Sequence, residues 1–244
     1  MKKIIQSNNY KLKIYYFIPV LFFGINFFLD TADLDQSIFS FLGHRSIFTH
    51  SILFPYIAYY FLIRKINKPN TYIQVGVISF FVAMGIHLSA DLHPRGWQGY
   101  ANIKFIGANL GGFLSFFWIA INSVICFVLA SYLLKSLTKK KPYIISYLAI
   151  SLLIGSAYSF EESVNQFKIF FTFVLFLLVS TYHVFEGNTD YLKKYTKKLK
   201  PEKSSILTPE AKKRFLKVIK YGAILLIAYY VIYIFFVFFN SRVF

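Results

Sequence analysis

The sequence predicts an all-α, polytopic integral membrane protein with about seven transmembrane helices and a cytoplasmic N-terminus. The first reason is composition: of the 244 residues, 57% are hydrophobic, 21% are aromatic and only 15% are charged. A soluble domain of this length could not bury so much apolar surface. The second reason is that the apolar residues form long runs separated by basic segments, the pattern of a chain that crosses a membrane repeatedly.

Seven apolar runs are long enough to cross a bilayer, which takes about 20 residues of helix. The first run ends in Phe27-Phe28-Leu29-Asp30 without the small residues of a signal-peptide cleavage site, so we expect it to remain as a membrane anchor. The predicted spans are approximately residues 12–29, 47–63, 72–90, 110–134, 142–160, 169–185 and 221–239.

The Lys and Arg residues decide the predicted orientation, because cytoplasmic segments carry an excess of them. With the N-terminus inside, the basic loops after the second, fourth and sixth spans all lie in the cytoplasm. The distribution also argues against a nucleic-acid partner, since the basic residues separate apolar spans instead of covering one face. Of the 27 basic residues, this arrangement leaves outside only Arg45, Arg95, Lys104, Lys168 and Arg242.

The chain divides into four parts on this interpretation. Residues 1–134 hold the first four spans and most of the unusual polar residues, and residues 135–186 hold two further spans. Residues 187–219 form a basic cytoplasmic segment that we expect to rest on anionic lipid head groups. Residues 220–244 hold the last span. The lone cysteine, Cys126, lies in an apolar run and excludes an intramolecular disulfide.

Three polar islands interrupt the apolar sequence at residues 30–35, 44–51 and 87–96, and the predicted topology puts all three on the outer side. Of the five histidines, only His183 lies elsewhere, near the inner end of the sixth span. Ionisable groups near membrane depth are costly, and by default they indicate function. The islands therefore predict a single site at the outer face.

The spacing of the histidines predicts metal binding. His87 and Asp91 are four residues apart at the end of the third span, so they project from one helix face. His44 and His50 are six apart and cannot both point inward from one unbroken helix. We therefore expect His44 in the approach loop and His50 in the first turn of the second span, capped by Ser46 or Thr49.

The first island adds two carboxylates. Asp33 and Asp35 alternate, and in an extended loop they would aim their side chains the same way. Imidazole and carboxylate suit zinc or another first-row divalent ion. The donors exceed what one tetrahedral ion needs, which leaves open two ions, or one ion with Asp33 or Asp35 free as general base. The predicted ligands are Asp33, Asp35, His44, His50, His87 and Asp91.

Two arginines indicate the class of substrate. Arg45 and Arg95 each lie inside a polar island on the predicted outer side. Guanidinium groups bind phosphate oxygens and stabilise the charge that develops in phosphoryl transfer. This favours a phosphate ester over a peptide, with Asp33 or Asp35 activating a metal-bound water and the two arginines holding the anionic group.

The order of these motifs resembles the YdjM-like (LexA-regulated type) membrane-bound metal-dependent hydrolases. The resemblance lies in Asp33-Leu34-Asp35, in His44 to Ser51, and in His87 to Asp91 followed by Arg95-Gly96. It implies a divalent-metal hydrolase of the bacterial inner membrane. His93 stands where the family usually has Thr, so it is an added ligand, a proton shuttle or a neutral variation.

The expected function is hydrolysis of a phosphate ester in a lipid or lipid-linked substrate at the outer face of the membrane. One alternative is a non-catalytic receptor or assembly factor stabilised by a metal. Another is a divalent-cation transporter, which would need acidic or histidine residues at mid-membrane depth and a second cluster on the inner side. The inner half of the predicted spans offers only His183. We expect residues 96–112 to cover the site as an interfacial or re-entrant segment. We expect Glu161 and Glu162 to be solvated loop charges, with a metal ligand or a general base as the alternative. Nothing in the sequence indicates an oligomeric state.

Overall fold

The computed structural model of the chain describes residues 13–37, 44–66, 70–93, 101–105, 108–162 and 166–187. Three of the predicted features lie outside the described residues. These are Arg95, the last predicted span and all but the first residue of the basic segment 187–219.

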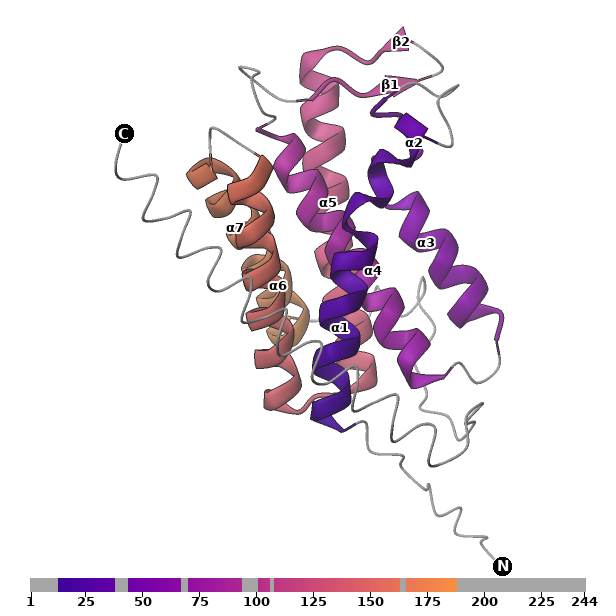
Figure 1. Ribbon diagram of the computed structural model, residues 1–244, viewed down its shortest axis with the longest axis vertical. Coiled ribbons are helices and arrows are strands. Elements are labelled where there is room, and N and C mark those ends of the chain that lie inside the picture. Colours follow the sequence, from indigo (N-terminus) through magenta and orange to yellow (C-terminus); the bar gives the residue numbers. More distant parts are fainter. Residues whose placement is uncertain are drawn as a thin grey trace, which may run out of the picture.

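Long helices make up most of the described chain and run side by side as a bundle (Figure 1). Five of them, with α1 extended by the turn that follows it, are long and apolar enough to cross a membrane. They match five of the predicted spans to within a few residues at each end. These helices are α1 (Ile14–Phe28), α4 (Thr71–Asp91), α5 (Gly112–Leu137), α6 (Lys141–Glu162) and α7 (Gln166–Glu186).

Helix α4 forms the centre of the bundle. Of its most apolar stretch, 89% is buried inside the protein, and it packs mainly against α5 and α1. Small residues permit this packing: Gly24 of α1 lies against Ser79 of α4, and Gly85 of α4 lies against the Phe127 ring of α5. The C-terminal end of α4, which carries His87 and Asp91, is therefore fixed by neighbours on several sides.

The second predicted span is a shorter helix than expected. It consists of α3 (Leu53–Tyr59) and a π-helical turn, η3 (Tyr60–Arg64), seven and five residues long. Twelve helical residues reach about 18 Å, less than the bilayer core of about 30 Å. The helix begins late because hydroxyl groups in residues 46–51 bond to nearby backbone and to Asp35, which competes with helix formation.

A small hairpin covers one end of the bundle. Strands β1 (Lys104–Phe105) and β2 (Ala108–Asn109) pair antiparallel, and β1 also forms a parallel bridge with the second polar island. The Lys104 N–H donates to the Arg45 carbonyl at 2.9 Å, and the Ile47 N–H donates to the Lys104 carbonyl at 2.9 Å. The described part of the predicted covering segment is thus attached to the site-bearing loop, and its depth in the membrane stays a prediction.

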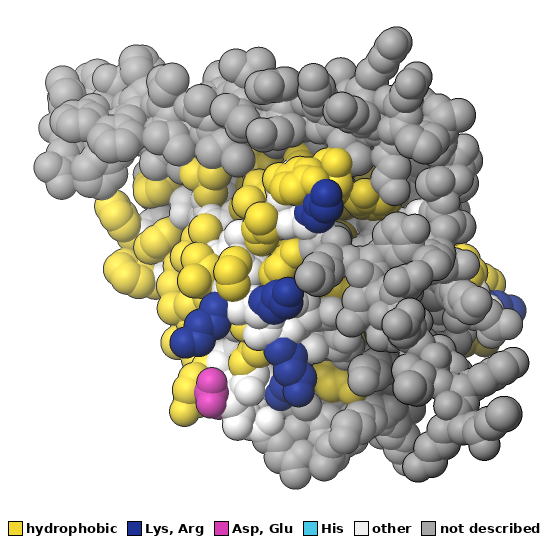
Figure 2. Space-filling view, turned by 90° about the horizontal axis from the view of Figure 1, so that it is seen from below, with side chains coloured by type: hydrophobic (Ala, Val, Ile, Leu, Met, Phe, Trp, Pro, Cys, Tyr) yellow, Lys and Arg dark blue, Asp and Glu magenta, His cyan; other side chains and the backbone are white. Residues whose placement is uncertain are grey.

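Basic residues gather at the end of the bundle away from the hairpin. Seen from that end, Lys and Arg side chains stand among apolar ones (Figure 2). The helices turn there, so their basic flanks meet. Those described are Lys13 before α1, Arg64 at the end of η3, Lys65 directly after it, Lys135 in the last turn of α5, Lys139 and Lys140 between α5 and α6, and Lys141 at the start of α6.

Candidate metal centre

The three polar islands meet at the hairpin end of the bundle. Asp33 ends the 3₁₀ helix η1 (Leu29–Asp33) that continues α1, and the short helix α2 (Leu34–Ser37) follows directly. The irregular segment before α3 brings the second island, and the end of α4 brings the third. The predicted residues that the structure brings together are Asp33, Asp35, His44, Arg45, His50, His87 and Asp91.

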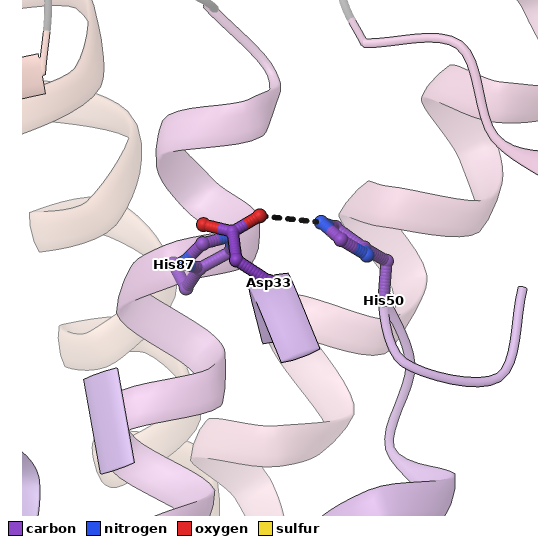
Figure 3. A group of neighbouring side chains, drawn as sticks. All are labelled: Asp33, His50 and His87. Atoms are coloured by element: carbon purple, nitrogen blue, oxygen red, sulfur yellow. Dashed lines mark ion pairs between the residues drawn. The ribbon is translucent and has the colours of Figure 1, made fainter. Parts of the chain in front are cut away.

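Asp33, His50 and His87 form one set of potential ligands (Figure 3). One ligand atom from each lies within 4.8 Å of the others. The Asp33 Oδ1 atom is 3.8 Å from His50 Nε2, and its Oδ2 atom is 3.8 Å from His87 Nε2. Asp91 Oδ2 approaches the same two nitrogens, at 3.3 Å from His50 and 3.7 Å from His87. Two imidazoles and two carboxylates thus face a common space.

The other ring nitrogen of each histidine is already engaged. His87 Nδ1 lies 3.1 Å from the Leu29 carbonyl oxygen and 2.9 Å from the Tyr158 hydroxyl. His50 Nδ1 lies 3.1 Å from the Thr49 hydroxyl and 3.4 Å from Asp35 Oδ2. A carbonyl or carboxylate behind Nδ1 favours the proton there, which leaves the Nε2 lone pair directed at the shared space.

Two of the facing atoms lack hydrogen-bond partners within the described chain. His50 Nε2 and Asp91 Oδ2 are both buried and 3.3 Å apart, yet they form no hydrogen bond with each other or with any other described group. Two buried acceptors that face one another are unfavourable unless a cation lies between them. The residues present therefore fit a divalent ion at this position.

Asp35 acts from behind the histidines. Its side chain is fully buried, and Oδ2 accepts the Ser46 N–H at 2.9 Å and the Thr49 hydroxyl, while Oδ1 lies 3.4 Å from His44 Nδ1. Burial alone would raise the pKa of the Asp35 carboxyl. The hydrogen bonds from His44, His50, Thr49 and Ser46 outweigh burial and hold that pKa well below its usual range.

A second potential ligand set overlaps the first. Asp33, Asp35 and His44 also place one ligand atom each within 4.8 Å of the others, so Asp33 belongs to both sets. The His44 side chain is 38% exposed and Asp33 is 34% exposed, whereas Asp35 and His50 are fully buried. His44 and Asp33 therefore form the side of the site that is open to approach.

Arg45 connects the candidate metal centre to the hairpin. Its Nε atom lies 3.3 Å from Asp91 Oδ1, and its φ of 63° places the backbone in the left-handed region that non-glycine residues rarely adopt. The hydrogen bond from the Lys104 N–H to the Arg45 carbonyl holds this conformation. Strained backbone of this kind is typical of functional sites.

Two predictions about local geometry are wrong. Asp33 and Asp35 do not alternate in an extended loop but lie in consecutive helical turns, so they project in different directions and only Asp35 is fully buried. His50 precedes helix α3 instead of lying in its first turn, and Ser51 Oγ accepts the N–H of Leu53, the first residue of the helix. The prediction that His87 and Asp91 share one helix face is confirmed.

His93 and His183 lie apart from these ligand sets. His93 Nε2 lies 3.1 Å from the Thr172 hydroxyl of α7, and burial, together with the charge of Lys168, lowers the His93 pKa. His183 is exposed near the far end of α7. The side chains of Glu161 and Glu162 fall outside the described part of the structure.

Helices α5 and α6 contribute residues that the sequence did not single out. The Trp118 Nε1–H donates to the His50 carbonyl at 3.0 Å, and Asn122 Oδ1 accepts the Ile52 N–H at 3.0 Å. Trp118 and Asn122 are four residues apart, so this spacing on one face of an apolar helix was an available signal. Tyr158 is one of many tyrosines in the chain, and no sequence pattern distinguishes it.

No protein-family model, no curated protein and no solved structure matches this chain.

Proposed function

We propose that this protein is a metal-dependent hydrolase acting on a phosphate ester of a lipid or lipid-linked substrate. The observation that carries the proposal is the pair of buried histidines whose Nε2 atoms face Asp33 and Asp91 while their Nδ1 atoms are held from behind. Two histidines and a carboxylate form the ligand set of well-known hydrolytic zinc sites, so zinc is the first choice of ion. The resemblance of the motif order to the YdjM-like hydrolases supports the same class.

The proposed roles follow from which atoms face the shared space. Asp33, His50 and His87 would hold the ion, and Asp91 would add a carboxylate beside it while it contacts Arg45. A divalent ion bound by these residues would lower the pKa of a coordinated water towards about 7 and would so supply a nucleophile at neutral pH. Arg45 neutralises charge on the substrate.

Proton transfer is assigned to His44 in this proposal. Asp35 is a poor base, because its low pKa and its hydrogen-bond donors keep it ionised and engaged. His44 is backed by Asp35 at 3.4 Å and is more than a third exposed, so it can exchange protons with water or with a leaving group. The alternative role for His44, as ligand of a second ion with Asp33 and Asp35, predicts two ions per chain.

The location belongs to the same proposal. Five helices of membrane-crossing length and a basic end opposite the site are consistent with a site on the outer side of a bacterial cytoplasmic membrane. Anionic lipid beneath the basic segment 187–219 would add to this anchoring. A membrane enzyme with its site at one end of the membrane-crossing helices would act on amphiphilic substrates.

Metal analysis of the purified full-length chain tests the proposal. We expect about one ion per chain in the wild type after removal of loosely bound metal, and loss of most of it in His50→Ala. His183→Ala is the matched control, because the same residue type is removed at the opposite end of the bundle. Equal metal content in the wild type and in His50→Ala would exclude the site.

Turnover separates the enzyme from a metal-stabilised receptor or assembly factor. The zinc-loaded protein should release phosphate or a phosphorylated head group from at least one member of a panel of phospholipids and lipid-linked phosphates, and a chelator should abolish the release. Retained metal without turnover on any member of the panel would favour the non-catalytic alternative.

A further inference from the structure

A pocket lies between the second polar island and the hairpin, directly beside the metal centre. Its volume is about 220 Å³, and it shares His44 with the open side of the ligand sets. Two of the lining residues, Arg45 and Lys104, are basic, and no carboxylate residue lines it among those described. The lining residues are His44, Arg45, Ala101, Asn102, Lys104 and Asn109.

Backbone contacts fix the position of Lys104. Its N–H donates to the Arg45 carbonyl and its own carbonyl accepts the Ile47 N–H, both at 2.9 Å, so β1 cannot shift without moving the site-bearing loop. Lys104 pairs directly with Asn109 across the hairpin, and cross-strand partners project from the same face. An ammonium group and a side-chain amide, both hydrogen-bond donors, are therefore presented together.

We infer that this pocket binds a phosphate group of the substrate through Lys104, Asn109 and Arg45. This inference rests on the proposed function and adds to it a named phosphate-binding residue, Lys104. A donor-rich pocket with two cationic residues suits a tetrahedral anion with several acceptor oxygens. Arg45 joins the two parts of the site, because it lines the pocket while its Nε contacts Asp91 beside the ion position.

Exposed apolar side chains on the segment before α3, on the hairpin, and on α3 and η3 favour a lipid as the source of the phosphate. The rings of Phe48 and Phe105 lie 6.4 Å apart at their centroids and are 41% and 46% exposed. Leu53, Ile57 and Phe61 are also exposed and follow at intervals of four along one side of the helix that begins at Leu53. The acyl or prenyl chain of a lipid bound at the pocket would thus find exposed apolar side chains on the same segment and on the helix that follows it.

Binding of inorganic phosphate to the zinc-loaded protein, measured by calorimetry in detergent, tests the pocket. We expect Lys104→Gln to raise the dissociation constant about tenfold or more, since it removes a charge-assisted hydrogen bond. Lys104→Arg, which retains the charge, should stay within about threefold of the wild type. Lys168→Gln is the matched control, because Lys168 is an exposed lysine at the same end of the bundle that does not line the pocket.

The controls separate this inference from the proposed function. If phosphate binding depends on Lys104 but the protein has no hydrolytic activity, the phosphate pocket is supported and the proposed function is excluded. Metal-dependent hydrolysis that Lys104→Gln leaves unchanged keeps the function and overturns the pocket. Equal phosphate affinity in the wild type and Lys104→Gln would also overturn the pocket assignment. A loss of phosphate affinity in Lys168→Gln as large as that in Lys104→Gln would overturn it as well.

A competition experiment identifies the source of the phosphate. Short-chain phosphatidic acid and glycerol 3-phosphate are compared as competitors of inorganic phosphate. Stronger competition by the lipid supports a lipid head group in the pocket and a role for the exposed rings of Phe48 and Phe105. Equal competition assigns the pocket to soluble phosphate esters, and failure of both competitors overturns the phosphate assignment.

Discussion

At the scale of single residues, the orientation of His87 depends on groups from distant parts of the chain. The Leu29 carbonyl and the Tyr158 hydroxyl both approach Nδ1, whereas Asp33 and Asp91 approach Nε2. Partners behind a ligand fix its tautomer and ring orientation, and removing one typically weakens metal binding tenfold or more. In the proposed site, Tyr158 would therefore be a positioning residue that does not touch the ion.

Tyr158→Phe should weaken zinc binding about tenfold, because the Leu29 carbonyl remains to hold the ring. A competition titration with a chromogenic chelator measures the affinity, and thermal unfolding of the metal-free protein measures stability. Tyr147→Phe is the control, since Tyr147 is a buried tyrosine of the same helix whose hydroxyl contacts Ser131 instead. Equal zinc affinity in the wild type and Tyr158→Phe would remove this role.

Asp35 should stabilise the folded protein in a pH-dependent way. Its folded pKa is lower than in an unfolded chain, so its stabilisation is fully present above the unfolded pKa of about 4 and is lost as pH falls through the folded value. Asp35→Asn should lower the stability of the metal-free protein by about 1–3 kcal/mol at neutral pH, with a smaller deficit in acid. Thermal unfolding at several pH values measures the difference.

The control for this measurement is Asp30→Asn. Asp30 is exposed and lies in η1, the short helix directly before the helix that carries Asp35. Its unfolding temperature should stay close to that of the wild type at every pH. A deficit in Asp35→Asn that grows in acid would contradict the sign of the effect.

At the scale of helices, the site depends on how closely α1 approaches α4. Helix α4 supplies His87, and Asp33 ends η1, which directly follows α1. The two helices touch where Gly24 faces Ser79. A Cβ atom at Gly24 would lie 2.6 Å from Ser79 Oγ, closer than such atoms can approach. Ser79 cannot easily move, because it is buried and its hydroxyl bonds to the Val75 carbonyl.

Gly24→Ala should therefore push α1 away from α4, lower stability by about 1–3 kcal/mol and weaken zinc binding. Gly76→Ala is a matched control on α4, because a Cβ atom there meets nothing within 4 Å. Helix propensity alone would make both substitutions neutral or stabilising. Unfolding temperature and zinc affinity are measured for both variants, and similar values would show that the close approach is unimportant.

The elements that the sequence predicts well are those decided by local composition. Long apolar runs form α1, α4, α5, α6 and α7 close to the predicted bounds. The start of α3 was predicted poorly. It depends on tertiary contacts such as the hydrogen bond from the Ile52 N–H to Asn122 of α5, which the local sequence does not reveal. The same holds for Asp35, whose partners come from a segment about ten residues later in the chain.

At the scale of the whole molecule, convergence of the three polar islands was predictable and their detailed roles were not. Topology alone sends the ends of α1 and α4 to one side, so Asp33, His87 and Asp91 had to come near each other. The contributions of Tyr158 and Lys104 depend on helix rotation and hairpin register, which apolar periodicity does not encode. Residues 1–134 were predicted to carry the site, but one contact to His87 comes from Tyr158 of α6, in residues 135–186.

The separation of the site end from the basic end predicts a fixed orientation in the membrane. Ala108, in the hairpin, and Lys140, between α5 and α6, are both exposed at opposite ends of the bundle. Because the basic end should face the cytoplasm, Ala108→Cys should react with a membrane-impermeant maleimide on intact cells. Lys140→Cys should react only after the cells are permeabilised.

The wild type is the control, since its single cysteine, Cys126, is fully buried in α5 and should stay unlabelled in both conditions. Labelling of Lys140→Cys on intact cells would contradict the predicted orientation. It would place the candidate metal centre on the cytoplasmic side, and the substrate would then have to be a lipid of the inner leaflet.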